Sequence, residues 1–246
     1  MKIPQSFEAP ADLLRDRVIL VTGAGDGLGK AAAIGAARHG ATVILLGRTV
    51  KKLEATYDAI KSVGAPEPAI YPMNLFGASW NDYGDLAATL EREFGKLHGL
   101  LHCAAHFKEF APLDNVDPKE WVESLQVNVT APFALTRACL PLLEKSGDAS
   151  VVFVSDAPGR HSKPYASAYG IAKHALEALM QTWSSELPKG SRVRMNSFVP
   201  GPLRTQLRAR GYPGEPRDAA PAPETAVPAL LWLLSPASRE VRGQQL

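Results

Sequence analysis

The chain has 246 residues, 46% hydrophobic and 21% charged, so it can bury a sizeable core and is not globally disordered. Lys and Arg total 27 against 25 for Asp and Glu, which gives no electrostatic case for a nucleic-acid or membrane-surface partner. The two cysteines, Cys103 and Cys139, are too few for a disulfide framework or a zinc knuckle and indicate a reducing compartment. Residues 1–10 lack the apolar core of a secretory signal, and no apolar run approaches the ~18 residues of a membrane span. We therefore expect a soluble, cytoplasmic protein.

Short apolar runs alternate with longer helical segments along the chain. The expected strands are residues 18–22, 41–46, 69–73, 97–103, 150–155 and 192–199. The expected helices are residues 28–39, 50–62, 80–94, 118–143 and 165–187, and Pro132 and Pro141 could kink or shorten the fourth. Continuous apolar strands in β-α-β order predict a parallel sheet with helices on both faces. The fold class is therefore α/β, in three α/β/α layers, with residues 1–246 forming a single domain.

The first expected strand leads into a glycine-rich turn with the pattern T-G-x-x-x-G-x-G. Glycines there allow close backbone approach, and free N–H groups at the start of the next helix can face a pyrophosphate. Glycine is also common in ordinary loops, but the position between a strand and a helix favours a nucleotide. The candidate cofactor residues of this turn are Thr22, Gly23, Gly25, Asp26, Gly27, Leu28 and Gly29.

The second expected strand is followed by Arg48, where an NAD site usually has an acidic residue for the ribose 2′-hydroxyl. A guanidinium suits a 2′-phosphate, because its planar fork makes charge-assisted, bidentate hydrogen bonds. Arg48 therefore predicts NADP(H), disfavours NAD, and argues against an S-adenosylmethionine site. The alternative is a solvated arginine at the start of a helix.

Tyr169 and Lys173 have the i, i+4 spacing that places two side chains on one helical face. A nearby ammonium favours the phenolate and lowers the pKa of a tyrosine, which makes it a usable proton donor or acceptor. Such pairs also occur by chance. This pair gains weight because it follows a nucleotide-type turn in the same expected sheet.

With these motifs in order, the chain resembles the short-chain dehydrogenase/reductase family over nearly its whole length, and most closely the YciK-type bacterial branch. The resemblance implies a Rossmann fold with strand order 3-2-1-4-5-6, a seventh strand, and hydride transfer between a nicotinamide and a carbonyl or alcohol substrate. It implies that Tyr169 exchanges a proton with the substrate oxygen. Lys173 would lower the pKa of Tyr169 and bind the nicotinamide ribose, and Asn128 would support Lys173 through a water relay.

The resemblance also assigns further segments of the chain. Residues 203–223 would form a substrate lid, a homodimer or homotetramer is implied, and residues 241–246 resemble the start of the last strand, so a C-terminal tail is expected beyond them. No metal site is expected. The further cofactor residues implied by the family pattern are Asn74 and Leu75 near adenine, Cys103, Ala104 and Ala105 after the fourth strand, and Pro200, Gly201, Leu203 and Thr205 near the nicotinamide amide.

The chain departs from the family pattern 13 positions before Tyr169, where Asp156 replaces the catalytic serine and Ser155 precedes it. Asp156 could be protonated and donate a hydrogen bond, or Ser155 could take the role after a backbone shift. Otherwise carbonyl reduction is weak or absent, or the substrate carries a positive charge that meets Asp156. The alternative function is an NADP(H)-binding scaffold or redox sensor with weak or no turnover.

Two weaker patterns concern histidine and arginine. His98, His102 and His106 recur every four residues on an expected strand and its exit, which separates successive histidines by about 13 Å. That is too far for one metal ion, and we expect core or loop residues. A basic cluster after residue 203 could bind an acidic substrate or be a solvated loop, and it consists of Arg204, Arg208, Arg210 and Arg217.

Overall fold

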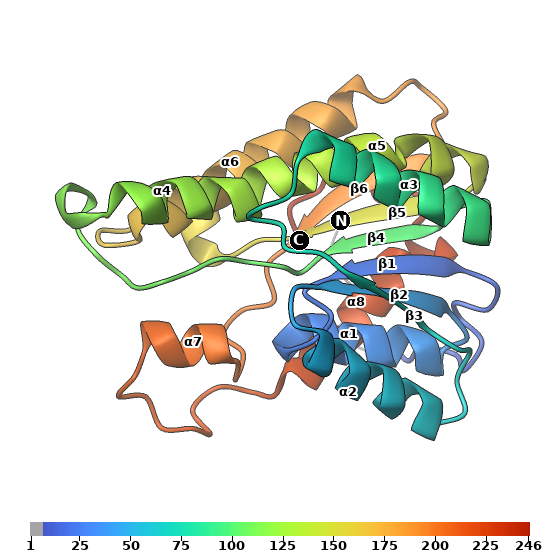
Figure 1. Ribbon diagram of the computed structural model, residues 1–246, viewed down its shortest axis with the longest axis horizontal. Helices are drawn as coiled ribbons and strands as arrows, with labels where there is room; N and C mark the ends of the chain where they lie inside the picture. The colour runs from blue at the N-terminus through green and yellow to red at the C-terminus, as the bar shows by residue number, and fades with distance from the viewer. Residues whose placement is uncertain (1–6) are drawn as a thin grey trace.

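The computed structural model describes residues 7–246, so the expectation for the first six residues lies outside the described chain. Six parallel strands form one sheet in the order β3-β2-β1-β4-β5-β6, as expected (Figure 1). The strands are β1 (Val18–Thr22), β2 (Thr42–Gly47), β3 (Ala69–Pro72), β4 (Gly99–His102), β5 (Ala149–Val154) and β6 (Val193–Phe198).

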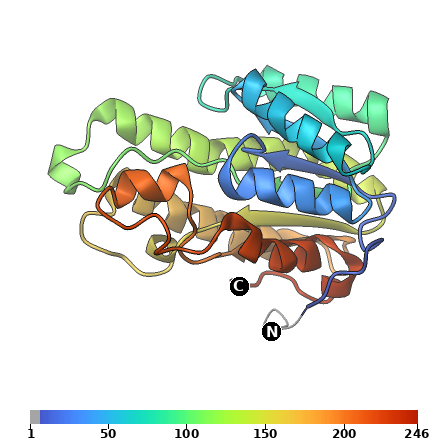
Figure 2. The ribbon, with the colours of Figure 1, turned by 90° about the horizontal axis from the view of Figure 1, so that it is seen from below.

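Helices cover both faces of the sheet, which confirms the doubly wound α/β/α fold (Figure 1). One face carries α1 (Gly27–Arg38), α2 (Val50–Ser62) and α8 (Val227–Leu234), and the other carries α3 (Trp80–Phe94), α4 (Pro118–Leu125), α5 (Ala131–Lys145) and α6 (Ser167–Glu186). The buried apolar residues accordingly form two clusters, one on each side of the sheet. A short helix, α7 (Gln206–Gly211), lies at the same end of the molecule as α4 (Figures 1 and 2).

The expected elements agree with the structure to within a few residues, and α2 and α3 have the expected bounds. The fourth expected helix is the exception, because it divides into α4, a π-helical turn (Gln126–Thr130) and α5. The chain stays helical throughout, and Pro141 lies inside α5. The π turn ends just before Pro132, whose nitrogen has no proton to donate in an α-helical pattern.

The expected seventh strand is not formed among the described residues. Instead, the end of the chain makes one parallel bridge to β6, between Ser197 and Gln245, and the Val199 N–H donates to the Leu246 carbonyl at 2.9 Å. Gly243, which has a left-handed φ of 61°, donates its N–H to the Met195 carbonyl at 2.9 Å, so the chain bonds to β6 from this residue onward.

The apolar helix α8 is buried by this chain's own residues. It packs on α1, where a Cβ at Gly35 would lie 2.4 Å from Val227 Cγ1, and on β5. The apolar residues of α8 are therefore buried within this chain. No helix among residues 7–246 is both long enough and apolar enough to cross a membrane.

An ion network ties the amino-terminal edge of the sheet together. Asp148 binds Arg17 at 2.9 Å and Arg194 at 2.6 Å, and both arginine side chains are almost fully buried. Burial lowers the pKa of both arginines, to about 10 in Arg194, and Asp148 opposes that effect. This edge is closed by structural contacts, so the carboxyl edge, where β1, β4 and β5 end, is the candidate position for a ligand.

Candidate active site

The glycine-rich turn after β1 is packed so closely that its glycines have no room for side chains. Gly23 has a φ of 68°, and a Cβ there would lie 3.0 Å from the backbone of Ala104. A Cβ at Gly29 would lie 2.4 Å from the Gly23 carbonyl oxygen. Asp26 caps α1 by accepting the Gly27 N–H at 2.8 Å. The turn therefore brings backbone close to the amino end of a helix, the arrangement that accommodates a phosphate group.

Segments that are distant in sequence meet at this turn. The Ala104 N–H donates to Thr22 Oγ1 at 3.0 Å, which places the segment 103–105 against β1. A Cβ at Gly27 would lie 3.3 Å from Thr205 Cγ2, so the segment 200–205 adjoins the turn as well. Asn74 follows β3 at the same edge and lines a shallow hollow with Tyr71 and Met73. The structure thus brings the expected cofactor segments to one edge of the sheet.

The first turn of α2 adds a cation that the sequence did not single out. A Cβ at Gly25 would lie 2.8 Å from Lys52 Cβ, and Lys52 Nζ lies 2.5 Å from Asp26 Oδ2. Arg48 is exposed directly after β2, in the residues leading into the same helix. Lys52, paired with Asp26, therefore adjoins the glycine-rich turn, and Arg48 lies between β2 and α2. Glycine geometry, a helix amino terminus and these cations are the features that fit NADP(H).

Tyr169 and Lys173 lie early in α6, and both side chains are buried, at 5% and 3% exposed. The Tyr169 hydroxyl donates to Asp156 Oδ2 at 3.0 Å. Lys173 Nζ donates to the Val154 carbonyl at 2.8 Å and lies 5.5 Å from the centre of the Tyr169 ring. A Cβ at Gly159 would lie 2.9 Å from the Lys173 backbone, so the turn after β5 lies directly against α6.

Burial and Asp156 dominate the electrostatics of this pair. Burial, together with the charge and hydrogen bond of Asp156, raises the pKa of Tyr169 well above 10. Desolvation and the carboxylate both disfavour the phenolate, and the lowering of the Tyr169 pKa by Lys173 stays a prediction. Burial lowers the pKa of Lys173 to about 8, although Asp156 opposes that shift. Tyr169 therefore holds its proton at neutral pH.

Asp156, and not Ser155, faces the Tyr169 hydroxyl. Asp156 Oδ1 accepts the Ala157 N–H at 2.7 Å, which fixes the carboxylate while Oδ2 meets the phenol. Ser155 is buried, and its hydroxyl has no hydrogen-bond partner within residues 7–246. The Ser155 N–H donates to the Phe198 carbonyl, which continues the pairing of β5 with β6. The backbone shift that would exchange the two residues is not present.

Asn128 lies in the π turn and fixes the loop after β4. Its Oδ1 accepts the His106 N–H at 3.2 Å, and its Nδ2 donates to the His106 carbonyl at 2.8 Å and to Ser124 O at 2.9 Å. Among the hydrogen bonds of the described residues, Asn128 has none directly to Lys173. The water relay implied by the family pattern stays a prediction.

The three histidines have separate partners, which agrees with the expected core and loop positions. His98 Nδ1 accepts the Val18 N–H at 3.0 Å, and His102 Nε2 lies 2.8 Å from Thr136 Oγ1. Burial lowers the pKa of His98 to about 4 and that of His102 to about 3. His106 Nε2 lies 2.8 Å from Glu120, and Glu123 completes a cluster whose ligand atoms all lie within 4.8 Å of one another. No sequence motif marks the two glutamates, which lie on α4.

An aromatic wall that the sequence did not reveal covers Tyr169. The Phe107 ring is 2% exposed and packs edge-on against Tyr169, with centroids 5.2 Å apart. Phe110 and Tyr212 extend the wall toward α7. A Cβ at Gly211 would lie 2.8 Å from Phe110, so α7 rests on these rings. No repeating pattern marks Phe107 and Phe110, because they lie in an irregular loop.

Two arginines of the basic cluster have partners in this chain. Arg208 forms a two-bonded pair with Glu215 at 2.5 and 2.6 Å and stacks on Tyr212. Arg210 donates to the Phe107 carbonyl at 3.3 Å. These contacts hold the segment 203–223 in place. They favour a structural role over recognition of an acidic substrate for these two residues.

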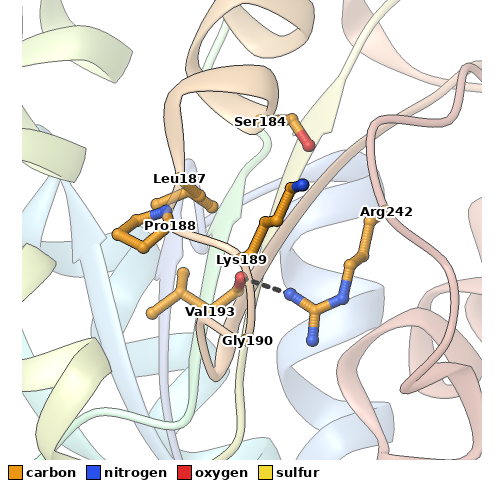
Figure 3. Close-up of a pocket in the computed structure, with 7 residues that line it drawn as sticks. All are labelled: Ser184, Leu187, Pro188, Lys189, Gly190, Val193 and Arg242. Atoms are coloured by element: carbon orange, nitrogen blue, oxygen red, sulfur yellow. Dashed lines mark hydrogen bonds between the residues drawn. The ribbon is translucent and has the colours of Figure 1, made fainter.

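A second hollow, shown in Figure 3, lies away from this site. Ser184, Leu187 and Lys189 line it near the end of α6, and Arg242 closes it by donating to the Val193 carbonyl at 3.0 Å. Val193 begins β6, so the hollow lies at the amino edge of the sheet, opposite Tyr169. It does not belong to the candidate active site.

Comparison with known proteins agrees with this geometry. The family model described as short chain dehydrogenase matches residues 17–215, and the chain therefore belongs to the short-chain dehydrogenase/reductase family of oxidoreductases. One relative, the uncharacterised oxidoreductase YciK of Escherichia coli, is 38% identical to this chain. The match covers 96% of this chain and 93% of the YciK chain.

Solved structures support the same branch of the family. A provisionally assigned short chain dehydrogenase from Pseudomonas syringae superposes with a TM-score of 0.96 and 46% identity, covering 98% of both chains. A similar protein from Shigella flexneri, crystallised in complex with NADP, has a TM-score of 0.93 and 38% identity, and the match covers 96% of this chain and 98% of that one.

Proposed function

We propose that this chain is an NADP(H)-dependent oxidoreductase that transfers hydride between the nicotinamide and a small-molecule substrate at Tyr169. The observation that carries the proposal is the buried Tyr169–Lys173 pair at the same sheet edge as the glycine-rich turn. The NADP complex of the Shigella relative supports the choice of cofactor. The chain would act as one catalytic domain, with residues 203–223 as a lid over the aromatic wall.

The residues of the carboxyl edge divide into binding and proton-transfer roles. NADPH, when bound, supplies the hydride. The amino end of α1 and the glycines would hold the pyrophosphate, Arg48 and Lys52 the 2′-phosphate, and Asn74 and Leu75 the adenine. Segments 103–105 and 200–205 would line the ribose and nicotinamide side.

Proton transfer is assigned to the Tyr169 hydroxyl. Its pKa lies well above 10, so it is protonated and able to donate at neutral pH. Lys173 would orient the ribose beside it, and Asn128 would act as a positioning residue by fixing the His106 backbone.

Cys103 and Cys139 are both unpaired, which supports a cytoplasmic location.

Cofactor choice is tested by titrating NADPH and NADH against the native protein and Arg48→Ala, with nucleotide fluorescence as the readout. A hydrogen bond to a charged group contributes roughly 1.5–3 kcal/mol, so NADPH affinity should fall about tenfold to a hundredfold while NADH affinity changes little. Lys61→Ala, at the other end of α2, is the matched control and should change neither. Equal losses for both nucleotides would show that Arg48 does not bind the 2′-phosphate.

The carboxylate at position 156 supports a second candidate function. Asp156 occupies the position from which a serine hydroxyl would donate to a substrate oxygen, and an ionised carboxylate cannot donate. An NADP(H)-binding scaffold or redox sensor would bind NADPH yet turn over neither carbonyl compounds, alcohols nor compounds with carbon–nitrogen double bonds. Turnover of any of these would exclude it, and failure to bind NADPH would exclude both functions.

The exposed apolar side chains of α3, α4 and α5 support self-association as a homodimer or homotetramer. Trp80 and Val122 are each 57% exposed, and Trp121 and Phe133 are also partly exposed. Light scattering after size exclusion should give a multiple of the chain mass. Val122→Asp should lower that mass, whereas Val50→Asp on α2 should not. A native protein of single-chain mass would refute the proposal.

A further inference from the structure

Asp156 gives the candidate active site an additional negative charge next to the proton donor. Its two oxygens accept from the Tyr169 hydroxyl at 3.0 Å and from the Ala157 N–H at 2.7 Å. The positive groups that interact with it are Lys173, whose ammonium donates to the Val154 carbonyl, and Arg208, which is paired with Glu215. Neither cation forms an ion pair with Asp156, so the carboxylate remains available to a substrate.

This charge opposes the reduction of a carbonyl. As hydride reaches a carbonyl carbon, negative charge develops on the oxygen, and a carboxylate beside Tyr169 would repel it. A protonated carbon–nitrogen double bond has the opposite polarity. It begins as a cation with an N–H group, and hydride transfer leaves a neutral amine. A carboxylate acceptor stabilises the charge and receives the N–H bond.

We propose that this site reduces a carbon–nitrogen double bond in its protonated form, with Asp156 accepting the hydrogen bond from the iminium N–H beside the Phe107 ring. The proposal rests on the NADP(H)-dependent function given above and names its substrate class. The electron pair and hydrogen of NADPH move to the iminium carbon, and the π electrons of the double bond become the nitrogen lone pair. The nitrogen takes up one proton from the acid of the bulk solvent before this step, so imine, one solvent proton and NADPH give amine and NADP⁺.

The surroundings of Tyr169 suit a flat, apolar substrate. Phe107 is buried against Tyr169, and Phe110 and Tyr212 extend the aromatic surface to α7. Aromatic faces also attract cations, which adds to the effect of the carboxylate. A cyclic imine fused to an aromatic ring combines these properties, and ring closure protects it against hydrolysis.

The test compares two substrates of the same shape. Dihydroisoquinoline is a cyclic imine, and α-tetralone is a ketone with the same fused rings. With NADPH, we expect the native protein to reduce the imine at least about tenfold more efficiently, because a hydrogen bond to a charged group contributes tenfold to a hundredfold. Asp156→Asn keeps the shape of the side chain and should reverse the preference. Asp58→Asn, an exposed α2 residue, should not.

Equilibrium binding gives a readout that is independent of turnover. Calorimetry on the NADPH-loaded protein, which cannot oxidise either compound, should show tighter binding of tetrahydroisoquinoline, which is protonated in neutral water, than of α-tetralol. Asp156→Asn should abolish that difference. If this variant does not fold, the amine-to-alcohol comparison on the native protein decides the question.

The outcomes separate this inference from the function on which it rests. Native protein that binds NADPH and reduces tetralone faster than the imine, or that binds amine and alcohol equally, overturns the inference and leaves the oxidoreductase assignment standing. Absence of NADPH binding overturns the oxidoreductase assignment itself.

Discussion

Replacing Asp156 with serine should convert this site into a better ketone reductase. The Asp156 carboxylate lies 3.0 Å from the Tyr169 oxygen and would repel a unit negative charge at that distance by about 5.5 kcal/mol at an effective dielectric constant near 20. Only part of a unit charge develops on a substrate oxygen, so this is an upper value. A serine hydroxyl would also supply the missing donor, and donors to a developing oxyanion contribute about 10²–10³ in kcat. We therefore expect kcat/KM for α-tetralone to rise at least about a hundredfold.

The same substitution should change the pH profile in a defined direction. Without the carboxylate, the pKa of Tyr169 falls, because two of the three causes that raise it are removed and only burial remains. The pKa of Lys173 also falls, to below about 8, because Asp156 opposes the effect of burial. Oxidation of α-tetralol, which needs Tyr169 as a base, should therefore reach its plateau at a lower pH than in the native protein.

The assay is steady-state kinetics across pH for both directions, with NADPH affinity measured in parallel. Asp58→Ser removes an exposed carboxylate on α2 and should leave rates and pH profile unchanged. An Asp156→Ser variant that reduces ketones no faster than the native protein, at unchanged NADPH affinity, would show that Asp156 does not impair carbonyl reduction.

Three further substitutions test the site and the stability of the fold. Ser155→Ala should retain turnover, since no described residue bonds its hydroxyl; a tenfold loss of kcat would identify Ser155 as the donor instead. Asp148→Ala should lower the free energy of unfolding in urea by about 3–5 kcal/mol, because two buried arginines lose their partner, and the exposed Glu93→Gln control should change little. The pKa of His98 is lowered to about 4, so its contribution to stability is retained above about 6.5 and lost as the pH falls through about 4. His98→Asn, which keeps an acceptor for Val18, should flatten the pH dependence in that window, and an unchanged slope would exclude His98 as its source.

The sequence predicted the sheet because its determinants are local. Buried parallel strands are continuous apolar runs, and the intervening helices are long enough to be distinguished from them. The glycine-rich turn and the Tyr169–Lys173 spacing are local as well, and the structure brings both to the carboxyl edge. Local patterns left two details open: the form of the irregularity near Pro132, which is a π turn, and the extent of pairing between residues 241–246 and β6, which is a single bridge.

Other parts of the site depend on tertiary contacts and could not be predicted. Phe107 contacts Tyr169 across 62 positions of sequence, from a loop without periodicity. Lys52 reaches the glycine-rich turn only because α2 packs on Gly25. Glu120 and His106 meet because Asn128 fixes the backbone of His106. Each of these residue types is common in proteins. Only the packing of helices and loops that are distant in sequence brings these particular residues into the site.

Asp156 shows how much a family pattern leaves undecided. The alternation of side chains along a strand places position 156, and not 155, toward Tyr169, so the spacing alone predicts which residue meets the phenol. The spacing of residues cannot predict the charge at position 156. A serine there favours a substrate atom that develops negative charge, whereas an acidic residue favours one that carries positive charge. In the proposed function the Tyr169–Lys173 pair would serve proton and hydride transfer, and the group beside it would select whether the carbon that receives hydride is bonded to oxygen or to nitrogen. Within this fold, substrate class is therefore best inferred from the electrostatics at position 156.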